Sequence, residues 1–159
     1  MSVESPPAVV LLDARVRGLD GPGLRAWARG GVAPDGAEFV SRSYREPFAL
    51  VGWHGGRVGV DIERLDPLDR AFAESICTPA ERKSFGGRLD DPELVASLWC
   101  SKEALAKALG DALAHDPRRL PSPLTWPDGA AGRWRARRLR SEAPTGHVAW
   151  LCWEELGAA

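Results

Sequence analysis

Two acidic residues, Asp61 and Glu63, alternate with apolar residues in the run VGVDIE at residues 58–63. This alternation is typical of a β-strand, in which successive side chains point to opposite faces. On such a strand the two carboxylates share one face, with their Cα atoms about 6.6 Å apart. The pair is either a polar face in contact with water or part of a site for a hard divalent cation such as Mg²⁺, which carboxylate and phosphate oxygens bind together.

A second group of charged residues lies in the run WCSKEALAK at residues 99–107. The apolar residues around it recur at helical spacing, and we predict a helix from a proline at residue 92 to about residue 109, just before a glycine. At about 100° per residue, Lys102 falls inside the apolar face of this helix, whereas Glu103 and Lys107 lie just past its edge. Glu103 and Lys107 can form a simple surface pair. Lys102 must either extend its ammonium group to solvent or meet an anion.

Several further elements are expected to position these two segments. The runs FALVGWH and RVGVDIERL flank Gly55 and Gly56, and we expect them to form a β-hairpin. A short helix is predicted to begin after Thr78, with Pro79 as its first residue and Glu81 completing a capping box. Strands are expected again in RWRARRL and HVAWLCWEEL near the end of the chain.

Together, the two charged motifs resemble those of the 4′-phosphopantetheinyl transferase superfamily, which read approximately (V/I)G(V/I)D(I/V)E and (F/W)xxKE(A/S)xxK. GVDIE and WCSKEALAK match them in order and in spacing, and CTPAERKSF, which contains Glu81, resembles the helix between them. The resemblance covers roughly residues 39–156. It implies an α+β fold of the 4′-phosphopantetheinyl transferase type, in which an antiparallel sheet packs against helices.

The resemblance also implies an activity and a set of site residues. Members of this family transfer the 4′-phosphopantetheine arm of coenzyme A to a serine of an apo acyl or peptidyl carrier protein, and they use Mg²⁺. The implied metal ligands are Asp61, Glu63 and Glu103. The implied catalytic residues are Glu103, Glu81 and Lys107, with Glu103 accepting the serine proton and Glu81 assisting. Lys102 and Lys107 would contact the phosphates of coenzyme A.

This chain departs from the family upstream of the first motif. Surfactin-type members carry a segment like SHS, whose histidine approaches the coenzyme A phosphate, where this chain reads Ser41, Arg42 and Ser43. Arg42 would replace that histidine, because guanidinium is a permanent cation with several donors, and Ser43 is predicted to bind the cofactor with it. We expect residues 1–40 to be a truncated N-terminal half, with one strand and a short helix. Residues 41–159 would form the transferase-like domain, and a homo-oligomer that completes the cleft is an alternative.

The composition is that of a folded globular protein, with 44% hydrophobic and 27% charged residues in a chain of 159. The net charge of −1 argues against a nucleic-acid partner, and no apolar run is long enough to span a membrane. We therefore expect a cytoplasmic protein without a membrane partner. Cys77, Cys100 and Cys152 are odd in number and lack metal-ligand spacing, which predicts reduced thiols in the core.

Two functions stay open at this point. An active transferase is favoured because every carboxylate and lysine position of both motifs is present. A noncatalytic or repurposed member, which binds a carrier protein or a coenzyme A-like ligand, is favoured by Arg42 and by the short segment before the first motif. Action on another carrier-linked substrate is a further alternative. The carrier's pathway (fatty acid, polyketide or nonribosomal peptide synthesis) and the choice between Mg²⁺ and Mn²⁺ are also open.

Overall fold

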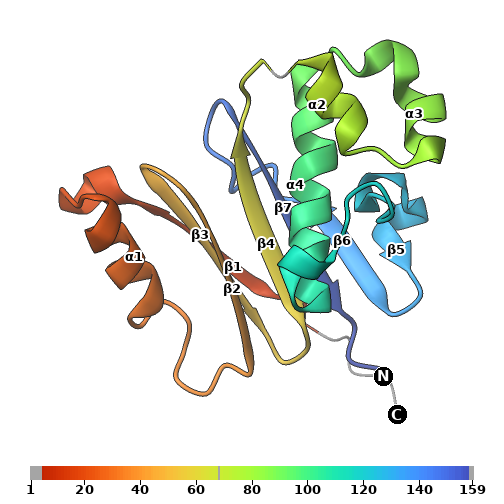
Figure 1. The fold of residues 1–159 in the computed structure, drawn as a ribbon. Helices are drawn as coiled ribbons and strands as arrows, with labels where there is room; N and C mark the ends of the chain where they lie inside the picture. The colour runs from red at the N-terminus through yellow and green to blue at the C-terminus, as the bar shows by residue number, and fades with distance from the viewer. Residues whose placement is uncertain (1–4, 68, 158–159) are drawn as a thin grey trace.

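The computed structural model describes residues 5–67 and 69–157 and contains two antiparallel sheets with helices packed against them (Figure 1). The strands of the first sheet are β1 (Ala8–Asp13), β2 (Phe39–Arg45) and β3 (Phe48–His54). Those of the second sheet are β4 (Val58–Arg64), β5 (Ala130–Ala131), β6 (Trp134–Arg138) and β7 (His147–Glu154). The α-helices are α1 (Gly21–Arg29), α2 (Arg70–Ser75), α3 (Pro79–Phe85) and α4 (Pro92–Leu109). This arrangement confirms the predicted α+β class with antiparallel sheets.

The two sheets share one pattern of connectivity. Their strand orders are β1-β3-β2 and β4-β7-β6-β5, and in each sheet the first strand of the sequence pairs with the last. A helical segment follows that first strand, α1 in one case and α2 to α4 in the other. The predicted boundary between residues 40 and 41 falls inside β2, which shares a sheet with β1 through β3. We call residues 8–54, with three strands and a helix, the N-terminal lobe.

The expected hairpin of β3 and β4 is wrong. β3 pairs with β1 and β2, whereas β4 pairs with β7, so the intervening link crosses from one sheet to the other. Gly56 lies in this link, and a Cβ added there would come within 2.9 Å of the carbonyl oxygen of Glu154. The glycine therefore permits close passage beside the C-terminal strand rather than a two-residue turn.

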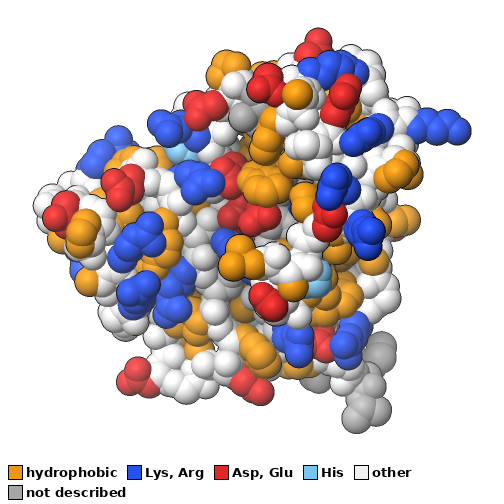
Figure 2. All heavy atoms as spheres, viewed as in Figure 1, with side chains coloured by type: hydrophobic (Ala, Val, Ile, Leu, Met, Phe, Trp, Pro, Cys, Tyr) orange, Lys and Arg blue, Asp and Glu red, His pale blue; other side chains and the backbone are white. Residues whose placement is uncertain are grey.

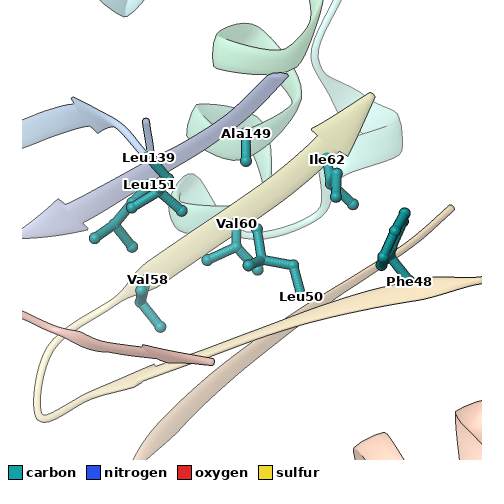
Figure 3. Close-up of a cluster of buried hydrophobic side chains, with 8 residues drawn as sticks. All are labelled: Phe48, Leu50, Val58, Val60, Ile62, Leu139, Ala149 and Leu151. Carbon is teal, nitrogen blue, oxygen red and sulfur yellow. The ribbon is translucent and has the colours of Figure 1, made fainter. Parts of the chain in front are cut away.

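The core between the two sheets consists of buried residues from β3, β4 and β7, together with Leu139 (Figure 3). Its members are Phe48, Leu50, Val58, Val60, Ile62, Leu139, Ala149 and Leu151. Every second residue of β4 points into this core, as the alternating pattern predicts. The other face of β4 is therefore left for a different neighbour.

That neighbour is α4, whose predicted bounds are confirmed. It begins after Asp91, whose side chain accepts a hydrogen bond from the Glu93 backbone N–H, and it ends before Gly110. Gly59 permits the contact with β4, because a Cβ added there would lie 1.9 Å from the carbonyl oxygen of Ala104. The acidic face of β4 consequently lies against the helix that carries the second motif.

α4 is also the longest helix, yet no helix in residues 5–67 or 69–157 combines the length and apolar character needed to cross a membrane.

All three cysteines are buried and free, which confirms the prediction of reduced core thiols. Burial raises the pKa of the Cys100 and Cys152 thiols. Because the thiolate is the reactive form of cysteine, neither residue is suited to act as a nucleophile at neutral pH.

Candidate active site

A pocket of about 320 Å³ lies where the N-terminal lobe meets β4 and α4. The residues that line it are Arg25, Arg42, Ser43, Tyr44, Arg45, Asp61, Glu63, Trp99, Glu103 and Lys107. Figure 2 shows acidic side chains gathered in a hollow, with Lys and Arg side chains on the side of the N-terminal lobe. Six of the eight site residues predicted from the sequence thus meet in one place.

Asp61 is held at the base of this pocket by two donors. Its Oδ1 atom accepts hydrogen bonds from Ser43 Oγ at 2.9 Å and from Lys107 Nζ at 3.1 Å. Its Oδ2 atom is buried and has no hydrogen-bond partner among the described residues. A buried carboxylate oxygen without a donor is unfavourable. This atom therefore marks a place where a ligand would be stabilising.

Glu63 lies beside Asp61 and is paired with an arginine of β2. Arg45 donates from Nε and Nη2 to the two carboxylate oxygens of Glu63, at 2.9 and 2.7 Å. Burial, and then the charge of Asp61, raise the pKa of Glu63 to about 7 despite the opposing effect of Arg45. The ion pair with Arg45 thus does not offset the burial of Glu63 and the charge of Asp61.

Glu103 and Lys107 reach the pocket from α4. Burial raises the pKa of Glu103, and the charge of Lys107 partly opposes that change. Lys107 Nζ donates to the carbonyl oxygens of Val60 at 3.0 Å and Arg42 at 3.2 Å, in addition to Asp61 Oδ1. These three acceptors account for its three hydrogens and tie α4 to β2 and β4. A phosphate contact by Lys107 would have to replace one of these bonds.

Arg42 is anchored beside the pocket by the last turn of α1. Its Nε atom donates to the carbonyl oxygen of Ala28 at 3.0 Å. Arg25, also on α1, places its guanidinium carbon 4.2 Å from the ring centroid of Tyr44. With Arg45, these residues make the N-terminal side of the pocket basic, opposite the carboxylates. Such a wall suits an anionic ligand.

Lys102 and Glu81 do not line this pocket. Their side chains form an ion pair with each other, and they are only 1% and 4% exposed. Lys102 Nζ also donates to the carbonyl oxygens of Ile76 at 2.6 Å and Pro117 at 2.8 Å. The prediction that Lys102 lies in the apolar face of the helix is borne out, and the anion that it meets is Glu81.

Glu81 is equally occupied within the protein. One of its oxygens accepts from the backbone N–H of Thr78, which confirms the predicted capping box, and the other accepts from the backbone N–H of Ser122 at 2.8 Å. The catalytic role of Glu81 and the phosphate contact of Lys102 stay predictions. Their placement favours a structural role, because the pair joins α3 to α4.

Arg45 lines the pocket but is not among the predicted site residues, and the same holds for Arg25, Tyr44 and Trp99. Along β2, Ser41, Ser43 and Arg45 alternate, so the period of two that places Ser43 on one face places Arg45 on the same face. A signal was therefore present in the sequence. Trp99 opens the second motif, although no role was predicted for it, whereas for Arg25 on α1 there was no comparable signal.

The donor atoms of the pocket fit a hard cation. Asp61, Glu63 and Glu103 all line it, and the Oδ2 atom of Asp61 has no hydrogen-bond partner among the described residues. Burial raises the pKa values of Glu63 and Glu103, so a cation would compensate for the loss of water around their carboxylates. Within residues 5–67 and 69–157, however, no three His, Cys, Asp or Glu side chains already converge as a ready-made ligand group. Both oxygens of Glu63 already accept from Arg45, so a cation at Glu63 would share this carboxylate with Arg45 or replace the arginine.

Comparison with known proteins identifies the class to which this fold and pocket belong. The model of the 4′-phosphopantetheinyl transferase superfamily matches residues 57–153. The chain therefore belongs to this superfamily, as the two motifs predicted. The matched segment runs from β4 through β7 and carries both motifs, whereas β2, which supplies Arg42, Ser43 and Arg45, lies outside it.

The proteins similar to this chain include two holo-(acyl-carrier-protein) synthases. The holo-(acyl-carrier-protein) synthase of Salinispora arenicola (strain CNS-205) is 35% identical over 75 residues, which cover 42% of this chain and 62% of that protein. The chain thus spans less than two thirds of that relative. The crystal structure of Thermotoga maritima holo-(acyl-carrier-protein) synthase is 25% identical, with a TM-score of 0.46, over 63% of this chain and 62% of that one.

Proposed function

We propose that this protein is a 4′-phosphopantetheinyl transferase, which moves the 4′-phosphopantetheine arm of coenzyme A to a serine of an apo acyl or peptidyl carrier protein. The observation that carries this proposal is the meeting of six predicted residues, from β2, β4 and α4, in a single pocket. Membership of the superfamily and the similarity to a holo-(acyl-carrier-protein) synthase support the same reaction.

In this reaction the serine oxygen attacks the phosphorus atom that bears the pantetheine arm. A new P–O bond forms, and the P–O bond to the leaving adenosine 3′,5′-bisphosphate breaks. Glu103, half-buried at the edge of the pocket, accepts the serine proton, directly or through a water molecule. Burial raises the pKa of Glu103 when no cation is bound, and the charge of Lys107 partly opposes this change.

The other pocket residues hold and orient the substrate. Asp61, Glu63 and Glu103 would hold Mg²⁺, and the cation would then neutralise charge on the pyrophosphate. Arg42 would bind an anionic group of coenzyme A with the guanidinium donors that Ala28 does not use. Lys107 fixes α4 against Asp61 and so sets the distance between the base and the acidic face of β4. Most of the rate enhancement would come from this positioning and from electrostatics.

The proposal is tested by incubating the protein with coenzyme A, Mg²⁺ and a panel of apo carrier proteins, and by measuring carrier mass. We expect at least one carrier to gain the mass of the arm, and we expect EDTA to abolish the gain. A protein that binds coenzyme A but modifies no carrier would support the noncatalytic alternative. If the protein neither binds coenzyme A nor modifies any carrier, the proposal is rejected altogether.

A further inference from the structure

Two serines of β2 perform the same task along the edge of β4. Ser41 Oγ accepts a hydrogen bond from the backbone N–H of Val60 at 3.0 Å, and Ser43 Oγ accepts one from that of Ile62 at 3.2 Å. Both serines are buried. Because β4 is the edge strand of its sheet, these N–H groups have no strand partner there. The serine hydroxyls therefore substitute for the carbonyl groups of a neighbouring strand.

Only one of the two serines also contacts the acidic face of β4. The Ser43 hydroxyl donates its hydrogen to Asp61 Oδ1 at 2.9 Å while its oxygen accepts from Ile62. Lys107 donates to the same carboxylate oxygen. The Asp61 carboxylate is thus fixed through Oδ1 and cannot rotate without breaking these bonds. Its other oxygen, Oδ2, is left without a protein partner among the described residues.

We propose that Ser43 is a positioning residue for the candidate cation site, which presents Oδ2 of Asp61 to the cation by holding Oδ1. The inference rests on the proposed function, in which Asp61 is a metal ligand. It gives Ser43 a role different from the coenzyme A contact predicted from the sequence. Hydrogen-bond partners of ligating groups orient them, and their removal typically lowers metal affinity by about 10- to 100-fold.

The experiment uses the full chain and Mn²⁺ alone as the probe, with free Mn²⁺ measured by electron paramagnetic resonance. Ser43→Ala is expected to raise the Kd for Mn²⁺ by about tenfold or more. Ser43→Thr keeps the hydroxyl donor and is expected to bind as the wild type does. Ser41→Ala is the matched control, because it removes the same kind of bond to β4 without touching Asp61; we expect its Kd to stay within about twofold of the wild-type value.

Thermal melts of the same proteins separate folding from positioning. The two alanine variants each lose one acceptor for a β4 N–H group, so similar shifts in Tm are expected. If Ser43→Ala does not fold, Ser43→Cys replaces it, because a thiol keeps the volume but is a weak donor, and the same direction of change is expected.

The possible results separate this inference from the proposed function. Equal Mn²⁺ affinities for Ser43→Ala and Ser41→Ala would overturn the positioning role, while binding by the wild type would still support the cation site. Failure of the wild type to bind Mn²⁺ would overturn both the cation site and the role of Ser43. The carrier assay would then show whether transfer occurs without a cation.

Discussion

Replacing Lys102 with methionine tests whether this lysine holds the fold together or binds substrate. Methionine keeps the length of the apolar stem but removes the ammonium group that meets Glu81 and two backbone carbonyl oxygens. The Glu81 carboxylate would keep two backbone N–H donors but lose its positive partner. Because the pair is almost completely buried, removing one partner leaves an uncompensated charge, which costs about 3–5 kcal/mol.

The loss is measured by urea unfolding, followed by tryptophan fluorescence. For a domain of this size each kcal/mol corresponds to about 2–4 °C in Tm, so thermal melts of the same variant should show a drop of roughly 6–20 °C. Lys83→Met is the matched control, since Lys83 lies exposed on α3, and its effect should stay within about 0.5 kcal/mol. The double variant Lys102→Met with Glu81→Gln should recover more than about 1 kcal/mol of the single-variant loss, because the unpaired charge is gone.

One combination of results would refute this reasoning. If Lys102→Met unfolded at the same urea concentration as the wild type but bound coenzyme A much more weakly, Lys102 would be a phosphate ligand, as the resemblance to the family implies. The structural role requires the opposite combination: lower stability, with the coenzyme A affinity of the folded variant unchanged in calorimetry.

Three further predictions concern the pocket and its supports. Asp61→Ala and Glu103→Ala should each abolish Mg²⁺-dependent transfer in a folded protein, and near-wild-type rates in either would reject the metal assignment. Gly59→Ala should destabilise the protein by about 3 kcal/mol, because its Cβ meets the backbone of α4, whereas Gly87→Ala has open space; equal urea midpoints would contradict this. Arg42→Ala should weaken coenzyme A binding about ten- to hundredfold in calorimetry, but not the binding of an analogue without the 3′-phosphate. Equal losses for both ligands would exclude Arg42 from a phosphate site.

The local features of the site could be predicted from the sequence because they depend on short-range periodicity. The period of two placed Asp61 and Glu63 on the face of β4 opposite the core, and the structure shows that face against α4. Pro92 and Gly110 bounded α4 correctly, since both act on the backbone within one turn. These signals are independent of what the rest of the chain does.

The pairing of distant segments could not be predicted in the same way. β4 pairs with β7, almost ninety residues further along the chain, and the adjacent run of β3 was the more obvious partner. Lys102 needed an anion, but helical geometry alone does not indicate which one; Glu81, 21 residues away, was assigned to the active site instead. Which strands pair and which charged groups meet depends on the surfaces that are buried together in the fold. A single sequence does not indicate which surfaces those are.

The position of the pocket follows from how the backbone N–H groups at the free edge of β4 find hydrogen-bond acceptors. Strands that pair directly lie about 4.8 Å apart, and at that spacing β2 would have continued the second sheet past β4. The serine side chains of β2 instead reach the β4 N–H groups through their hydroxyls, which separates the two backbones by the length of a side chain. Lys107 of α4 reaches between β2 and β4, where it donates hydrogen bonds to the carbonyl oxygens of Arg42 on β2 and Val60 on β4. Because side chains join β2 to β4, the space between the two strands can present a carboxylate oxygen to a ligand. Two strands paired directly through their backbones would leave no such space.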